Sequence, residues 1–232
     1  LVIRTTEGDF HTGYFINTAG LYSDQIAQDF GFGNDYTIIP FKGMYLEYEK
    51  NKTDVITNVY PVPNLNNPFL GAHFTKVVGG GIKIGPTATP AFWRENYKDW
   101  HRFKLNEFLR ISYYMAKLFI LNSFQFRSLA LEEIKKYRKA YFVDLSMKMI
   151  RELDRKGFGN YLPPGVRAQL LHKKSLELVQ DFVIEGDDQS MHVLNAVSPA
   201  FTCSLPFAAY VADQIAEKRG KQEGSRAAEQ VI

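Results

Sequence analysis

The sequence contains a single cysteine, Cys203, among its 232 residues. One cysteine excludes an intrachain disulfide and a zinc site built from several cysteines, and it fits a reducing compartment. An excess of one charge is also missing, because 28 lysines and arginines nearly balance 25 acidic residues. A net charge of +3 does not indicate nucleic-acid binding. We therefore expect a cytoplasmic protein with no nucleic-acid partner.

Long apolar runs are missing as well. No stretch of about 18 apolar residues occurs, so we expect no transmembrane helix, and peripheral association with the inner membrane stays open. The first ten residues, LVIRTTEGDF, lack the basic and apolar regions of a signal peptide. They also lack an initiator methionine and read as a strand. We therefore expect the chain to begin partway through a domain.

The composition is that of a globular protein with a sizeable core. Hydrophobic residues make up 45% of the chain and charged residues 23%, and there are 18 phenylalanines and 13 tyrosines. The length corresponds to one or two domains.

The first half of the chain predicts mainly strands. After strands within residues 1–17, a small-residue turn (Thr18–Gly20) leads into a helix over Leu21–Phe30. This order suits a helix end that meets a phosphate or a flavin edge, but an ordinary βα connection has the same pattern. The next strands follow one another without a helix between them, which predicts an antiparallel sheet. They are expected at 38–48, 55–62, 69–78 and 81–84, with a turn at 64–68.

The second half changes character. Helical periodicity extends from Tyr97 to about Asp154 and predicts three helices, the second capped by Ser128 and the third over Phe142–Leu153. Glycines and prolines between 157 and 164 end this region. Later elements are expected as strands at 166–171, 178–184 and 192–194, a helix over 205–218 and a frayed polar tail at 219–232. The predicted fold is α+β, an antiparallel sheet with a helical layer.

Familiar nucleotide and metal motifs are incomplete. The nearest run to G-x-G-x-x-G, Gly79–Gly85, has Ile84 where the third glycine belongs and lies between two strands, so it predicts a hairpin turn. No Walker A, HExxH or GxSxG pattern occurs. The five histidines lack ligand spacing on any one element, so we expect no metal site.

Two residues and one segment are candidates for chemistry. His73 lies among small and apolar residues and could accept a proton near pH 7, or could be a core histidine bonded to a backbone carbonyl. Arg167 lies on an apolar strand and needs an anion, either a substrate carboxylate or an internal Asp or Glu. Ser198–Ser204 precedes the last helix and either presents free N–H groups or caps the helix through Thr202 or Ser204.

The order and spacing of several motifs resemble the D-amino-acid-oxidase-like FAD-dependent oxidoreductases. Phe15–Asp24 is similar to a segment shared by that family, and other segments are similar to its branch of L-2-hydroxyglutarate dehydrogenases and oxidases. The branch segments are Pro40–Tyr45, Tyr60–Pro63, Pro68–Thr75, Gly85–Ala88, Gly165–Gln169, Asp181–Val183 and His192–Ala200. The resemblance covers about residues 12 to 217 and is least distinctive over 100–160.

This resemblance implies an FAD enzyme that oxidises a 2-hydroxy acid, L-2-hydroxyglutarate first, by hydride transfer from C2 to flavin N5. It implies His73 as the base and Arg167 as the carboxylate anchor, with Lys42 and Tyr45 as further substrate contacts. The segment 195–204 would stabilise negative charge on the reduced flavin. The implied cofactor residues are Asn17, Ala19, Gly20, Asn195, Ser198, Pro199, Ala200 and Thr202.

The sequence also departs from the family pattern. The βαβ unit with the glycine-rich pyrophosphate loop is absent, Lys42 replaces an arginine and Met44 replaces an acidic residue. We therefore expect a C-terminal portion that is inactive on its own: 1–39 and 165–218 from the FAD-binding domain, and 40–164 as the substrate domain. Two other hypotheses stay open, an amino-acid or other hydroxy-acid oxidase and a non-catalytic binding module. The electron acceptor (oxygen, a quinone or a carrier) is open too.

Overall fold

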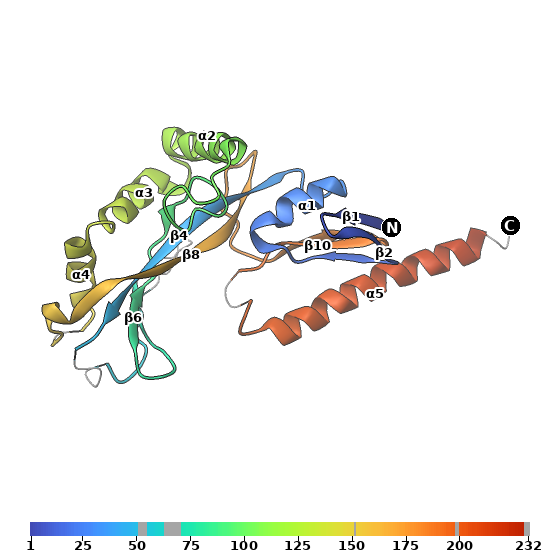
Figure 1. Cartoon of the computed structure of the whole chain (residues 1–232). Coiled ribbons are helices and arrows are strands. Elements are labelled where there is room, and N and C mark those ends of the chain that lie inside the picture. The colour runs from blue at the N-terminus through green and yellow to red at the C-terminus, as the bar shows by residue number, and fades with distance from the viewer. Residues whose placement is uncertain (51–54, 63–70, 151, 198–199, 230–232) are drawn as a thin grey trace. The chain divides into compact units, whose positions relative to one another are not determined.

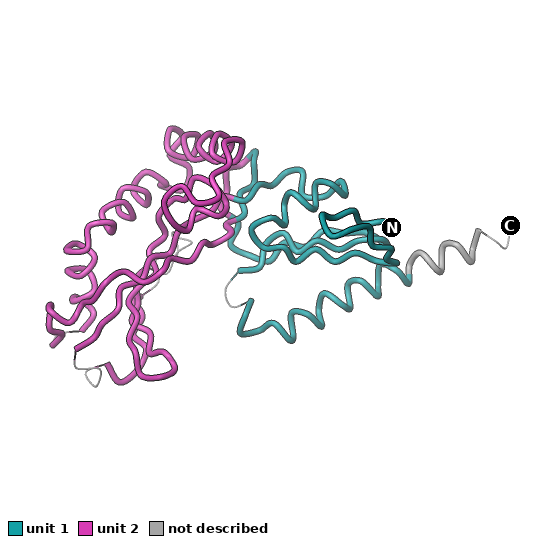
Figure 2. Tube along the Cα trace, viewed as in Figure 1, with its two compact units in different colours: residues 1–38, 170–174, 179–232 teal, residues 39–169, 175–178 magenta. Residues whose placement is uncertain are grey.

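The computed structural model describes residues 1–50, 55–62, 71–150, 152–197 and 200–229, the stretch 221–229 by its backbone alone. The chain divides into two compact units (Figure 2). Unit 1 contains residues 1–38, 170–174 and 179–232, and unit 2 contains residues 39–169 and 175–178. The turn expected at 64–68, the first two residues of the strand expected at 69–78, and Ser198 and Pro199 lie outside the described residues.

Unit 1 is built on a three-stranded sheet. Strand β10 (Ser190–Asn195) lies in the middle, parallel to β3 (Phe15–Asn17) and antiparallel to β9 (Val183–Gly186). All six residues of β10 are buried, as expected of a central strand covered on both faces. A separate hairpin pairs β1 (Val2–Thr5) with β2 (Gly8–His11).

The helices of unit 1 follow β3 and end the chain (Figure 1). A 3-10 turn, η1 (Gly20–Tyr22), leads into α1 (Ser23–Asp29), where a helix was predicted. Helix α5 (Ser204–Glu229) packs Val211 against Met191 and Val193 of the sheet. The prediction that the polar tail is frayed from Arg219 is wrong as far as Glu229, because α5 continues to that residue. Residues 221–229 consist largely of Lys, Gln, Glu, Arg and Ala, which are good helix formers, so polarity alone does not end the helix.

Unit 2 is built on an antiparallel sheet with the strand order β5-β6-β4-β7. Its strands are β4 (Tyr36–Tyr48), β5 (His73–Lys76), β6 (Ile82–Gly85), β7 (Thr89–Pro90) and β8 (Phe158–His172), and β8 pairs with β4. The hairpin turn predicted at Gly79–Gly81 is confirmed, since Val77 N–H donates to the Gly81 carbonyl at 2.9 Å between β5 and β6.

A helical layer follows β7 in the chain, as predicted (Figure 1). It consists of α2 (Leu105–Leu121), η2 (Ser123–Gln125), α3 (Phe126–Lys135), α4 (Lys139–Met147) and η3 (Arg155–Gly157). The main core joins Phe142 and Val143 of α4 to Leu46, Phe74 and Ile84 of the sheet. The α+β prediction is therefore confirmed. No helix among the described residues is long and apolar enough to cross a membrane.

Three local predictions are wrong. Residues 55–62 form no strand and contribute one isolated bridge, between Val59 and Phe74. Helix α3 begins at Phe126 and not after a Ser128 cap, and α4 ends at Met147. Strand β8 begins at Phe158 and runs through Pro163 and Pro164, where we expected only a break. A proline is tolerated in a strand wherever its missing N–H is not needed by the ladder.

Candidate functional site

His73 begins β5 and lies in a row of residues that crosses unit 2. The pairing of Val59 with Phe74 places Tyr60 directly opposite His73 on one side. On the other side His73 pairs with Gly85 of β6. The register between β6 and β4 continues the row to Tyr45. Directly opposed residues point to the same face of a sheet, so these four residues share a face.

This face is the one opposite to the main core. Phe74 of β5, Ile84 of β6 and Leu46 of β4 are buried in the core. Because side chains alternate along a strand, the neighbours His73 and Tyr45 point the other way. The row is thus held by a packed sheet while its own side chains stay available to a ligand.

Gly85 allows Tyr45 to lie where it does. A Cβ added at Gly85 would lie 2.9 Å from Cδ1 of Tyr45 and 2.6 Å from the carbonyl oxygen of Met44. Gly85 also has a φ of +146°, a backbone conformation that favours glycine. A side chain at this position would push the Tyr45 ring away from the row.

The imidazole of His73 is held as a neutral base. Burial lowers its pKa below the ordinary value near 6.5, a hydrogen bond between the imidazole and the Gly71 backbone raises the pKa, and the positive charge of Arg167 lowers it. Its Nδ1 is buried and has no partner with hydrogen-bond geometry among the described residues. A neutral imidazole with an unpartnered nitrogen can accept a proton from a bound group.

Arg167 lies on β8 with an exposed side chain. The strand is not apolar throughout as expected, because exposed and half-buried residues alternate on either side of Arg167. Among the described residues Arg167 forms no ion pair with a carboxylate. Its charge acts on His73, so the structure brings these two candidates near each other.

Lys42 is not part of this row. It lies three residues before Tyr45 on β4, so regular alternation puts the two side chains on opposite faces. Lys42 is half-buried, and burial lowers the pKa of its ammonium, while Asp99 raises it. Its carbonyl accepts hydrogen bonds from the hydroxyls of Thr87 and Thr89 at 3.2 and 3.1 Å.

In unit 1, the two segments expected to meet a cofactor lie at one edge of the sheet. Asn17 ends β3 and Asn195 ends β10, and these strands are parallel neighbours. Open α/β sheets bind ligands outside the carboxyl ends of their parallel strands. The turn after β3 is exposed at Thr18, Ala19 and Gly20, and a Cβ at Gly20 would meet nothing within 4 Å. This open turn fits a cofactor held through the backbone.

The side-chain amides of Asn17 and Asn195 form hydrogen bonds inside the unit. The Asn17 amide donates to the Ser23 carbonyl at 2.8 Å, contacts His192 and accepts from Ala19 N–H. The Asn195 amide donates to the carbonyls of Val179 and Asp181 at 3.2 and 2.7 Å. Both residues are almost completely buried, so they shape the edge and leave its contacts to neighbouring backbone.

The last cofactor candidates lie between β10 and α5. Ala200 is half-buried and its N–H donates to the Val197 carbonyl at 2.6 Å. Thr202 is exposed in the turn just before α5. Ser198 and Pro199 lie outside the described residues. Among the described residues no group of His, Cys, Asp and Glu could hold a metal ion.

Sequence reasoning singled out neither Tyr60 nor His192 for a role of its own. Tyr60 stacks on His73 with ring centroids 4.4 Å apart, and only the bridge between Val59 and Phe74 reveals this contact. His192 is fully buried against Phe30 and Phe32 and bonds to Asn17 and Ser190. The run of buried residues in β10 is consistent with its burial, but the sequence gives no sign of its partners.

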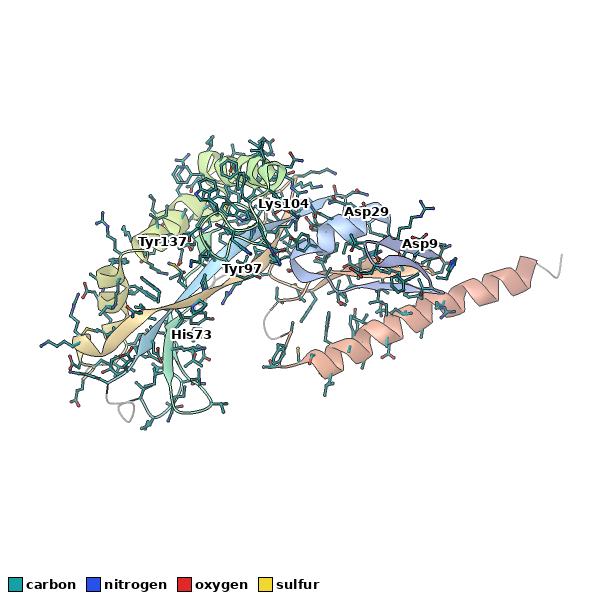
Figure 3. All side chains as sticks on the ribbon, viewed as in Figure 1. Asp9, Asp29, His73, Tyr97, Lys104 and Tyr137 are labelled. Atoms are coloured by element: carbon teal, nitrogen blue, oxygen red, sulfur yellow. The ribbon has the colours of Figure 1, made fainter. Side chains whose placement is uncertain are left out.

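Figure 3 shows His73 on the strands of unit 2, and Tyr97 and Lys104 on the segment that leads into α2.

The chain matches the family model described as FAD dependent oxidoreductase (DAO) over residues 1–213. It is 36% identical over 208 residues, 88% of its length, to the L-2-hydroxyglutarate dehydrogenase of Indibacter alkaliphilus. It is 34% identical to the mitochondrial L-2-hydroxyglutarate dehydrogenases of Bos taurus and Homo sapiens, over 94% of its length in each case.

These alignments cover 51% of the bacterial relative and 48% of each mammalian one. The chain therefore spans about half the length of the curated relatives it matches. The resemblance found in the motifs is confirmed for the family and for the branch that carries the dehydrogenase names. The chain belongs to the FAD-dependent oxidoreductase family known as DAO.

Proposed function

We propose that this chain supplies the substrate-binding row and part of the flavin-binding edge of an enzyme that oxidises a 2-hydroxy acid. The preferred substrate is L-2-hydroxyglutarate, which would become 2-oxoglutarate. The observation that carries the proposal is the buried Nδ1 of His73, which has no hydrogen-bond partner among the described residues, together with the positive charge of Arg167 that acts on this imidazole. The names of the relatives support the choice of acid.

The oxidation removes a proton from the C2 hydroxyl and a hydride from C2. When bound, FAD would supply the hydride acceptor, N5 of the flavin. His73 accepts the hydroxyl proton at Nδ1, because burial and Arg167 keep this imidazole neutral at pH 7. A protein side chain would thus accept the proton, and the cofactor would accept the two electrons of the hydride.

Arg167 binds a carboxylate of the substrate through paired N–H donors. Tyr45 contributes a further contact from the same row as His73. Lys42 is a weaker candidate for this role, because alternation along β4 directs it to the other face. An exposed arginine with no internal carboxylate partner among the described residues can bind an external acid without first breaking an ion pair.

The cofactor contacts of this chain come from the edge where β3 and β10 end. The exposed backbone of Thr18–Gly20 and the segment from Asn195 to Thr202, which includes Ser198, Pro199 and Ala200, would hold the flavin side of FAD. Backbone N–H groups before α5 would stabilise negative charge on the reduced ring. Asn17 supports this edge from inside through its bonds to Ser23 and Ala19.

The test uses the intact protein purified with its cofactor. We expect a yellow protein whose flavin absorbance bleaches without oxygen when L-2-hydroxyglutarate is added, and not with the D enantiomer. His73→Gln should bleach at least about a hundredfold more slowly. Bleaching by glycine or a D-amino acid would favour an amino-acid oxidase, and a colourless protein would favour a binding module. Cell fractionation tests the expected cytoplasmic location. The two mammalian relatives are described as mitochondrial, whereas the bacterial relative is not.

A further inference from the structure

Tyr60 is fixed beside β5 although its segment forms no strand. Val59 N–H donates to the Phe74 carbonyl at 3.0 Å, and Phe74 N–H donates to the Val59 carbonyl at 2.8 Å. These two hydrogen bonds make one antiparallel bridge, and Tyr60 and His73 are the next opposed pair. In such pairs the Cβ atoms are about 4.5–5.5 Å apart. The backbone alone therefore brings the two rings together.

The two rings lie face to face. Their centroids are 4.4 Å apart and their planes differ by 27°. Tyr60 is 53% exposed while its stacking partner is half-buried. The phenol ring thus covers one face of the imidazole and keeps water from that side.

We propose that Tyr60 is a positioning residue for His73, which fixes the plane of the imidazole and shields it so that Nδ1 faces the bound acid. The proposal rests on the proposed role of His73 as the base. Tyr60 itself touches neither the reacting atoms nor the cofactor in this assignment. Its hydroxyl is dispensable, and its ring is what matters.

The charged groups around His73 make the effect of Tyr60 measurable. Arg167 of β8 lowers the pKa of His73 by charge repulsion. Tyr45 lies on the same face beyond Gly85. Lys83, two residues before Gly85 on β6, lies on this face directly opposite Glu47 of β4 and Thr75 of β5 in the strand register.

Removing the ring should therefore raise the pKa of His73. Water would reach the imidazole and stabilise its protonated form, so the pKa would move up toward its ordinary value. The acidic limb of kcat/KM follows the pKa of the free base and would move to higher pH. Loss of the aromatic contact should also lower kcat roughly three- to tenfold, with KM little changed.

The experiment compares Tyr60→Ala with Tyr60→Phe in the intact protein with FAD bound. The NMR signal of His73, assigned through His73→Gln, is titrated in each variant, and kcat/KM is measured against pH. We expect Tyr60→Ala to raise the pKa and shift the limb, and Tyr60→Phe to match the parent protein. Circular dichroism checks that both variants fold, which the exposure of Tyr60 favours.

The outcomes separate this inference from the proposed function. An unchanged pKa of His73 in folded Tyr60→Ala overturns the positioning role, whatever the enzyme oxidises. An equal loss in Tyr60→Phe also overturns it, since the hydroxyl and not the ring would then be responsible. A shifted pKa in a protein that oxidises no 2-hydroxy acid supports the positioning role and refutes the proposed function.

Discussion

Asn17 Nδ2 lies 3.2 Å from Nδ1 of His192, and this contact ties β3 to β10 inside unit 1. The orientation of the amide is fixed, because its oxygen accepts from Ala19 N–H. Asn17 must therefore donate to Nδ1, which leaves Nε2–H of His192 to donate to the Ser190 hydroxyl at 3.0 Å. This bonding defines a neutral histidine in the middle of the sheet.

Replacing Asn17 with Ala should destabilise the fold. The change removes the bonds to Ser23, Ala19 and His192, all inside a buried site. We expect a loss of about 2–3 kcal/mol in the free energy of unfolding, measured by urea denaturation. The control is Asn34→Ala, whose amide makes one exposed bond to the Gly31 carbonyl, with an expected loss of about 1 kcal/mol or less. Equal losses in the two variants would contradict the structural role of Asn17.

Stability should fall as the pH drops below about 6.5. Burial lowers the folded-state pKa of both His192 and His73. The unfolded chain then binds more protons than the folded one in the window below 6.5, so the stabilisation is complete above that pH and is lost toward the folded pKa values. Urea denaturation between pH 7.5 and 5.5 measures this slope.

The matched variant is His192→Gln, which keeps polar atoms but does not titrate. It should be less stable at every pH, because two buried hydrogen bonds are disturbed, yet its stability should change less with pH. A variant with the slope of the parent protein would show that His192 is not a source of the pH dependence.

A buried ion pair lies at the C-terminal end of α3, and its carboxylate also bonds to the backbone just before β7. Lys136 and Glu133 bond to each other with side chains only 5% and 3% exposed. Glu133 also accepts from Ala88 N–H at 2.6 Å. Lys136→Met should cost about 3–5 kcal/mol, because it leaves a buried carboxylate without its cation. Lys135→Met, on the same helix but exposed, should cost less than about 0.5 kcal/mol. Thermal and urea unfolding compare the two, and similar midpoints would refute the role of the pair.

Arg167→Met should weaken binding of the acid. A hydrogen-bonded charge pair contributes about 1.5–3 kcal/mol, so KM should rise roughly ten- to a hundredfold. Arg167→Lys keeps the charge but loses the paired donors, and its KM should lie between those of the parent protein and Arg167→Met. Removing the positive charge should also raise the pKa of His73, moving the acidic limb of the pH profile upward. Steady-state kinetics from pH 5 to 8 measure both effects, and an unchanged KM would remove Arg167 from the site.

Local patterns predicted the elements whose signals are local. The glycines between β5 and β6 and the periodicity of α2 both lie within a few residues of the structure they specify. The prediction failed at residues 55–62, where the one backbone bridge among the described residues joins Val59 to Phe74. It failed again at β8, which extends through two prolines because β4 supplies a long partner strand. Strand length depends on the neighbour, and the neighbour is distant in sequence.

The same division holds for the candidate site. The sequence by itself determined the family and led to the proposal of a histidine for the proton and an arginine for a carboxylate, because residue identity and motif order carry that information. Only the tertiary structure decided which residues meet. Register placed Tyr60, His73, Gly85 and Tyr45 in one row and set Lys42 apart, and it turned Asn17 and Asn195 inward to hold backbone carbonyls. Side-chain direction in a sheet follows strand pairing, and a shift by one residue reverses it.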